Sequence, residues 1–147
     1  MTPFLKVLSQ KEYRILSAVA ERIVTEASGT FGVDLAQRID SVLSGVRKEM
    51  AGEMKLLLNV FEYGAIFSGL QFKRFTQMGP DERDRYLASW EESPFPLKRT
   101  GFQALKRSAL AAFYGSEASW PAIGYRGPWL TRGYPHDFEG KRIEVPD

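Results

Sequence analysis

The chain has 147 residues, of which 44% are hydrophobic and 26% are charged, and its formal net charge is +2 at pH 7. This length fits a single domain that can bury a hydrophobic core without the support of disulfides or structural metals. The basic residues are dispersed along the chain, which argues against a nucleic-acid-binding stripe, and the absence of cysteine excludes disulfides, thiolate metal sites and a cysteine nucleophile.

The first predicted helix begins at a capping box, Ser9-Gln10-Lys11-Glu12. The Ser9 hydroxyl can accept a hydrogen bond from the backbone N–H of Glu12, and the Glu12 carboxylate can accept one from that of Ser9. The preceding residues lack the basic region, apolar run and cleavage site of a secretory signal. The apolar side of the helix carries Leu16, Val19, Ile23 and Val24, and Ser28-Gly29-Thr30 ends it.

A second helix is expected over residues 33–44, and a third begins near Val46. The most apolar run of the chain, 54–70, lies in this third helix. Lys55, Asn59 and Glu62 interrupt it before about 18 clean apolar residues, so the run predicts a core helix and not a membrane span. Because apolar side chains surround nearly its whole circumference, we expect it at the centre of a bundle, with neighbours on several sides.

A connector with three aromatic anchors, Phe67, Phe72 and Phe75, leads to the fourth helix. That helix opens at Gly79-Pro80-Asp81-Glu82, with proline at its first position and acidic residues in its first turn. Its apolar stripe consists of Tyr86, Leu87 and Trp90.

The fifth helix follows Pro94 and Pro96 and ends near Gly115, where a left-handed C-cap is expected. Residues at helical spacing form its apolar stripe: Phe102, Leu105, Ala109, Ala112 and Phe113. The sequence therefore predicts an all-α fold, a single-domain bundle of about five helices over residues 1–129.

After the fifth helix comes an aromatic segment punctuated by glycine and proline, followed by an extended C-terminal arm over residues 130–147. Aromatic and arginine side chains of this kind are typical of interface hot spots. The candidate partner interface is Trp120, Tyr125, Arg126, Pro128, Trp129, Arg132, Tyr134 and Phe138. The alternative is an intramolecular clasp in which Trp120 and Trp129 cap the helical core.

The sequence offers no catalytic, cofactor-binding or metal-binding residues. His136 is the only histidine, so neither a catalytic triad nor a two-histidine metal motif can be built. The acidic residues Asp81, Glu82 and Asp84 are explained as partners of the helix dipole. Gly124-Tyr125-Arg126-Gly127 is not a phosphate-binding loop, because no strand precedes it and no helix follows it.

The order and spacing of these elements resemble the gluconate 2-dehydrogenase subunit 3 family. Its members are the small (gamma) subunits of FAD-dependent sugar and polyol dehydrogenases of the glucose–methanol–choline type. The resemblance covers most of residues 4–128, and 113–128 is its most specific part. It is carried by FLKVLSQKEYRILSAVAERIV, GVDLAQRID, MKLLLNVFEYG, GPDERDRYLASWEES and LKRTGFQALKRSALAAFYGSEASWPAIGYRGP.

The resemblance implies a non-catalytic subunit that binds, stabilises or helps to mature a larger catalytic subunit. The FAD and the substrate base belong to that partner, and a cytochrome c subunit is an optional third component. Neither nucleic-acid binding nor direct membrane insertion is expected. Many family members carry a twin-arginine signal, which this sequence lacks. We therefore expect a cytoplasmic complex, with export through a signal on the partner, or through one removed from the chain, as the alternative.

Two other function classes stay open. An independent enzyme is disfavoured, because the sequence shows no convergent set of polar residues. A stand-alone helical adaptor or chaperone would bind its client transiently, and a stable stoichiometric complex would separate it from the subunit hypothesis.

Overall fold

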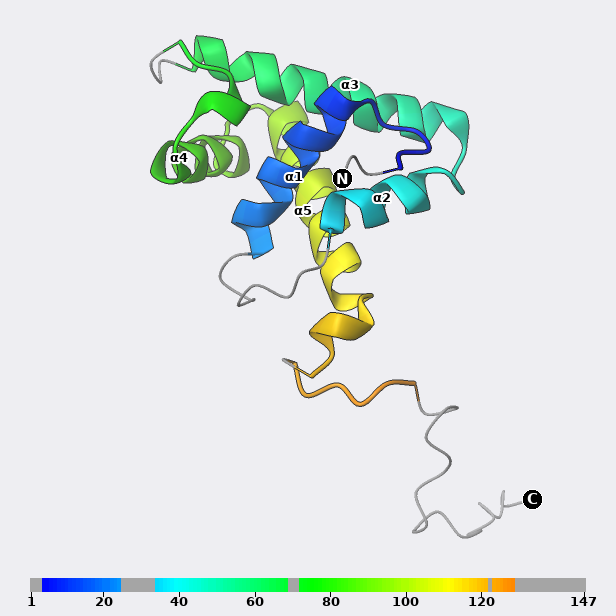
Figure 1. The fold of residues 1–147 in the computed structure, drawn as a ribbon. Coiled ribbons are helices and arrows are strands. Elements are labelled where there is room, and N and C mark those ends of the chain that lie inside the picture. The colour runs from blue at the N-terminus through cyan, green and yellow to red at the C-terminus, as the bar shows by residue number, and fades with distance from the viewer. Residues whose placement is uncertain (1–3, 25–33, 69–71, 122, 129–147) are drawn as a thin grey trace, which may run out of the picture.

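The computed structural model describes residues 4–24, 34–68, 72–121 and 123–128, and all regular structure in these ranges is helical. This confirms the predicted all-α bundle of about five helices (Figure 1). The five α-helices are α1 (Gln10–Val24), α2 (Leu35–Leu43), α3 (Lys48–Gly64), α4 (Pro80–Glu91) and α5 (Pro96–Tyr114). Three short 3-10 turns accompany them: η1 (Ala65–Phe67), η2 (Phe75–Gln77) and η3 (Glu117–Ser119).

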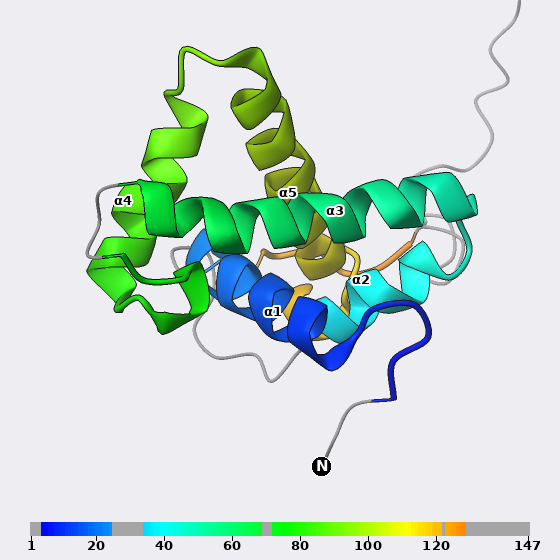
Figure 2. The same ribbon diagram turned by 90° about the horizontal axis from the view of Figure 1, so that it is seen from above.

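The helices are stacked so that α3 crosses one end of the bundle, with α1 and α2 directly beneath it (Figures 1 and 2). α5 packs against α1, α2 and α4, and so runs through the middle of the molecule. α4 and α5 form an antiparallel hairpin whose connecting end projects away from the other helices (Figure 2). The long α5 thus takes the central place that the sequence assigns to α3.

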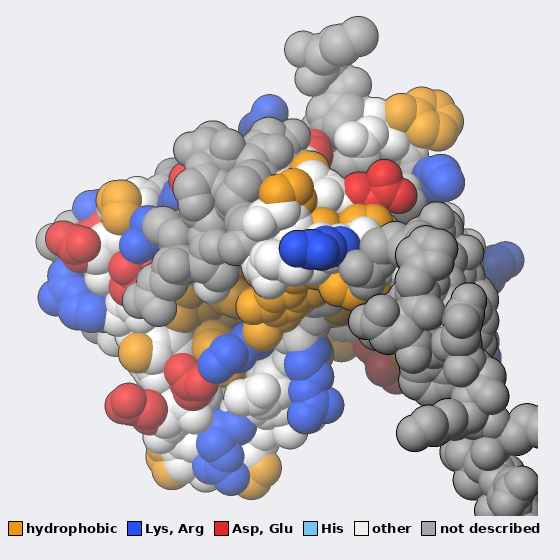
Figure 3. Space-filling view, turned by 90° about the horizontal axis from the view of Figure 1, so that it is seen from below, with side chains coloured by type: hydrophobic (Ala, Val, Ile, Leu, Met, Phe, Trp, Pro, Cys, Tyr) orange, Lys and Arg blue, Asp and Glu red, His pale blue; other side chains and the backbone are white. Residues whose placement is uncertain are grey.

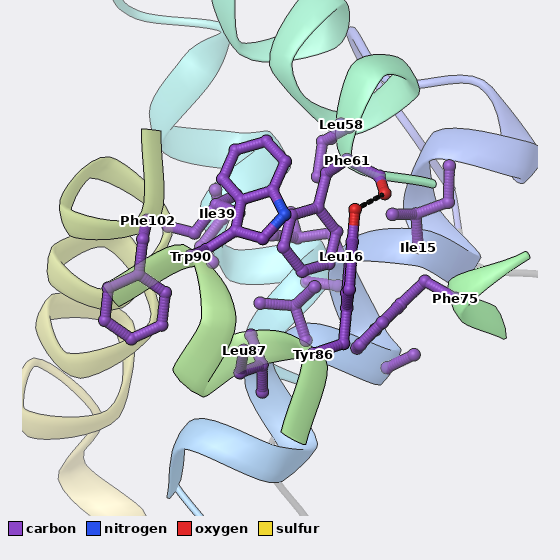
Figure 4. Close-up of a cluster of buried hydrophobic side chains, with 14 of the residues drawn as sticks. Ile15, Leu16, Ile39, Leu58, Phe61, Phe75, Tyr86, Leu87, Trp90 and Phe102 are labelled. Carbon is purple, nitrogen blue, oxygen red and sulfur yellow. Dashed lines mark hydrogen bonds between the residues drawn. The ribbon is translucent and has the colours of Figure 1, made fainter. Parts of the chain in front are cut away.

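Aromatic side chains from α3, α4 and η2 form the centre of the core (Figure 4). The ring of Phe61 contacts those of Phe75, Tyr86 and Trp90 at centroid distances of 4.8, 4.9 and 4.8 Å. The tilted and edge-on geometries are those that aromatic quadrupoles favour. The Tyr86 hydroxyl donates a hydrogen bond of 2.9 Å to the carbonyl oxygen of Phe61, so its polar atom is satisfied within the core.

The predicted starts of α1 and α4 and the apolar stripe of α5 are confirmed. At α1 the backbone N–H of Ser9 donates to the Glu12 carboxylate at 2.8 Å, and the Glu12 N–H lies 3.3 Å from the Ser9 hydroxyl oxygen. At α4 the N–H of Gly79 donates to Glu82 at 2.8 Å, and Pro80 is the first helical residue. All five predicted stripe residues of α5 are buried.

A buried carboxylate that the sequence did not reveal ties the N-terminal segment to α2. Asp40 is fully buried, and its two oxygens accept hydrogen bonds from three consecutive backbone N–H groups. The donors Lys6, Val7 and Leu8 lie at 2.6, 3.0 and 2.7 Å. Burial by itself would raise the pKa of Asp40, but these three donors outweigh it and lower the pKa.

The prediction that α3 is surrounded by neighbours is wrong. Leu56 is 65% exposed and Val60 is 51% exposed, while the opposite side, with Leu58 and Phe61, is buried. The helix begins at Lys48, two residues after Val46, as predicted. It crosses the edge of the bundle, so one side packs against α1, η1 and η2 (Figure 2). Its apolar outer side therefore has no intramolecular explanation in the described residues.

Two further local predictions are corrected. Of the three aromatic anchors in the connector only Phe75 is buried, because it joins the aromatic cluster, whereas Phe67 and Phe72 are largely exposed. Gly115 has φ −76°, which is right-handed, so the helix does not end in a left-handed cap. Instead the Arg38 side chain donates to the Gly115 carbonyl oxygen and satisfies that end of α5.

Candidate partner-binding surfaces

The aromatic loop, described at residues 120–121 and 123–128, contacts the end of α5 through Trp120. The indole N–H of Trp120 donates to the Tyr114 carbonyl oxygen at 3.2 Å, and the Tyr125 backbone N–H donates to the Trp120 carbonyl oxygen at 2.9 Å. The two rings meet edge-on at a centroid distance of 5.1 Å. Trp120 is half-buried, while Tyr125 remains exposed.

A buried serine that sequence reasoning missed anchors this loop. Ser119 is fully buried, and its hydroxyl lies 2.6 Å from the Phe113 carbonyl oxygen and 2.7 Å from that of Ser116. Beyond it the chain turns through Gly124 and Gly127, whose φ angles of 68° and 93° favour glycine. The loop is therefore held at its base and presents its outer side to solvent.

The loop combines features of both sequence hypotheses. Trp120 packs on its own helix, as the clasp requires, whereas Tyr125, Arg126 and Pro128 are exposed, as an interface requires. The other four candidate interface residues lie outside the described residues; these four are Trp129, Arg132, Tyr134 and Phe138. His136 and the whole arm 130–147 also lie outside them. Their roles stay predictions.

A second candidate surface is the α3 outer face, which we define as Leu56, Val60, Tyr63 and Phe67. These residues follow one another at steps of four, three and four, so they form one line along α3 and η1. All four are exposed. Single exposed apolar residues are ordinary on protein surfaces, but a contiguous line of them marks an interaction site.

The C-terminal end of the α3 outer face carries a cation. Lys11 donates to the Asn59 side-chain oxygen at 2.6 Å, and its ammonium lies 4.5 Å from the centroid of the Tyr63 ring. The interaction of the Lys11 ammonium with the Tyr63 hydroxyl lowers the pKa of that hydroxyl. The apolar period of this segment includes these residues, but periodicity alone could not show whether another helix of the chain covers them.

Three of the four acidic side chains of α4 make structural contacts, and the fourth, Asp81, is exposed in the first turn. Asp84 forms a two-point ion pair with Arg22 at 2.7 and 2.6 Å, and the hydrogen bond from Arg22 lowers the pKa of that carboxyl. The backbone N–H of Gly79 lowers the pKa of Glu82. Glu91 pairs with Lys106 at 3.0 Å. Within the described ranges no group of three or more His, Cys, Asp or Glu side chains is placed to hold a metal ion.

None of the described helices is long and apolar enough to cross a membrane. No protein-family model, curated protein or solved structure matches this chain. The surface itself is therefore what the structure offers for a functional argument. Its distinctive property is the hydrophobic area on the α3 outer face, which suits protein–protein contact.

Proposed function

We propose that this chain is the non-catalytic small (gamma) subunit of an FAD-dependent sugar or polyol dehydrogenase, in which it binds and stabilises the larger catalytic subunit or assists its maturation. The resemblance of the sequence to the gluconate 2-dehydrogenase subunit 3 family supplies the identity of the partner. The structural observation that carries the proposal is the α3 outer face, a line of four exposed apolar side chains.

The size of this face fits a contribution to a stable interface. Fully burying one large apolar side chain is worth about 1.5–3 kcal/mol. Because Leu56 and Val60 are 65% and 51% exposed, each would gain about half of that value on docking. Such gains must offset the entropy lost on association, so the α3 outer face needs a second contact region to give a lasting complex.

The exposed part of the aromatic loop is that second region in our proposal. Tyr125 and Arg126 are residue types enriched at hot spots, and the loop is preorganised by Ser119 and the Trp120–Tyr125 ring contact. The loop and the α3 outer face lie at opposite ends of the bundle (Figure 1). A partner larger than this chain can reach both. Trp129, together with Arg132, Tyr134 and Phe138 of the arm 130–147, completes the proposed contact.

In this proposal the chain itself carries no cofactor and performs no chemistry. The FAD and the catalytic base belong to the larger subunit, and a cytochrome c subunit is an optional third component. We place the complex in the cytoplasm, with the periplasm as the alternative if a signal on the partner exports it.

The test is co-expression with a flavoprotein dehydrogenase subunit of the glucose–methanol–choline type, sought among the neighbouring reading frames, followed by size-exclusion chromatography with a flavin absorbance trace. Val60→Glu places a charge in the α3 outer face. Val42→Glu is the matched control, because Val42 is the same residue type, is 63% exposed and lies on α2. We expect the wild type and Val42→Glu to co-elute with flavin and Val60→Glu to elute apart.

The outcomes separate the hypotheses. If the wild type does not co-elute with the flavoprotein, the subunit proposal is wrong. If it co-elutes and Val60→Glu does too, the subunit proposal survives but the α3 outer face is not its interface. Complex formation that is seen only while the flavoprotein folds, and not with the mature enzyme, would favour the transient chaperone.

A further inference from the structure

The end of the α4–α5 hairpin exposes two large apolar side chains that the proposed subunit interface does not use. Every residue from 94 to 100 is exposed. Phe95 is 64% exposed and Leu97 is 84% exposed, so both side chains project into solvent. This end of the hairpin stands away from the rest of the bundle (Figure 2).

The backbone holds these side chains in place. The N–H of Phe95 donates to the Ser93 hydroxyl oxygen at 3.2 Å, and the Phe95 carbonyl oxygen accepts from the N–H of Lys98 at 3.1 Å. Arg99 closes the turn, since its guanidinium donates to the Ser93 carbonyl oxygen at 2.6 Å. Ordering this end on a partner would therefore cost little conformational entropy.

Cations lie directly behind the apolar side chains. Lys98 and Arg99 occupy the first turn of α5, a helix with four basic residues and no acidic one. Lys98 lies 5.9 Å from the Trp90 ring centroid and 6.0 Å from that of Phe95. Figure 3 shows basic and acidic side chains spread over the hairpin and hydrophobic side chains at its end. Basic groups at a helix N-terminus oppose the helix dipole, so an external anion would stabilise them.

The acidic groups nearby do not cancel this charge. Glu91 is paired with Lys106, whereas Glu92 is exposed at the end of α4, next to the turn. Among the described residues around this turn, Lys98 and Arg99 therefore outnumber Glu92, the one carboxylate here without an ion pair in the described part of the chain. Charges that lie farther from the turn than the Debye length, about 8 Å at physiological salt, are largely screened and contribute little.

We propose that the end of the α4–α5 hairpin binds the surface of an anionic lipid bilayer, with Phe95 and Leu97 at the level of the headgroups and Lys98 and Arg99 against lipid phosphates. The projecting shape favours this occupant, because a fluid bilayer accepts a convex apolar point, whereas a protein partner must offer a matching hollow. Apolar side chains combined with cations are the pattern by which proteins attach to the bilayer interface without spanning it. The attachment is independent of the proposed subunit function.

The test uses the full chain with vesicles of phosphatidylcholine, alone or mixed with phosphatidylserine. Because the chain has no cysteine, Leu97→Cys can be labelled at one site with an environment-sensitive dye. Phe67→Cys is the matched control, since Phe67 is equally exposed but lies on η1. We expect a blue shift for the label at position 97 on phosphatidylserine vesicles only, and no shift at position 67.

Two charge measurements complete the test. Co-sedimentation of the wild type with phosphatidylserine vesicles should weaken as salt rises, and Lys98→Glu with Arg99→Glu should reduce binding by at least about tenfold, since each cation near such a surface contributes roughly fivefold. The proposal is overturned if the wild type binds neither vesicle, if the label at position 67 shifts as much as that at 97, or if the hairpin variants abolish flavoprotein binding while leaving vesicle binding unchanged.

Discussion

Replacing Asp40 with Asn tests the contact that fixes the N-terminal segment to α2. The carboxylate accepts hydrogen bonds from Lys6, Val7 and Leu8 at 2.6, 3.0 and 2.7 Å and is fully buried. Asparagine keeps the shape but replaces one acceptor oxygen with an NH₂ group, which faces a backbone N–H that also donates. It also removes the negative charge that strengthens the remaining bonds.

The expected loss follows from these contacts. A hydrogen bond to a charged group contributes about 1.5–3 kcal/mol, and leaving a buried donor unsatisfied costs about 1–3 kcal/mol. Asp40→Asn breaks at least one such bond and weakens the others, so we expect the free energy of unfolding to fall by about 3 kcal/mol. Asp81→Asn is the control, because Asp81 is exposed in the first turn of α4, and its expected effect is within about 0.5 kcal/mol.

The sign of the pH dependence is fixed by the lowered pKa of Asp40. The stabilisation by this carboxylate is present above the pKa of the unfolded chain, about 3.9, and is lost as the pH falls through the lower pKa of the folded state. The difference in the free energy of unfolding between wild type and Asp40→Asn should therefore become smaller at acidic pH.

Urea denaturation followed by circular dichroism measures the global effect, and amide hydrogen exchange at Val7 and Leu8 reports local release of the segment. A loss below about 0.5 kcal/mol at neutral pH, with unchanged exchange at both amides, would refute the reasoning.

Three further predictions concern the helix start and the aromatic core. Ser9→Ala should lower the free energy of unfolding by about 1 kcal/mol in urea denaturation, since it removes half of the capping box, and no change would show that the Glu12 contact suffices. Tyr86→Phe should cost about 1 kcal/mol at neutral pH. Burial raises the pKa of Tyr86 to about 12. The free energy of unfolding of the wild type should therefore fall as the pH rises from about 10 through the raised pKa, and Tyr86→Phe should not show this fall. Phe61→Ala should cost about 4 kcal/mol, because a fully buried ring in contact with three others is removed, and a loss below about 2 kcal/mol would mean that the cluster collapses into the space.

The features predicted correctly from sequence are those encoded locally. The capping box needs only Ser9 and Glu12, three residues apart, and the stripe of α5 needs only its own period. Proline and acidic residues at the start of α4 act within one turn. Such signals do not depend on where other segments lie.

The features that were missed depend on contacts between distant segments. The donors to Asp40 lie 32 to 34 residues away, so an aspartate inside a helix gave no local sign of its role. The period of α3 identified its apolar residues but could not tell a neighbour in the same chain from one in another. For the same reason the sequence did not distinguish Phe75, which is buried, from Phe67 and Phe72.

The candidate site was predicted in part. The aromatic loop was recognised from composition, but the inward turn of Trp120 depends on one hydrogen bond to Tyr114 and on the anchor at Ser119, which have no sequence signature. The α3 outer face was not predicted as a surface at all. Among the described residues it is now the main reason to expect a partner.

The most direct test of the central claim is dye-linked sugar oxidation by a candidate flavoprotein subunit, produced with and without this chain under otherwise equal conditions. The subunit proposal predicts that omitting the chain lowers the yield of flavin-loaded enzyme or its activity, and that the two proteins co-elute in a fixed ratio when produced together. Full activity of the flavoprotein alone, with this chain eluting as a separate monomer, would contradict it.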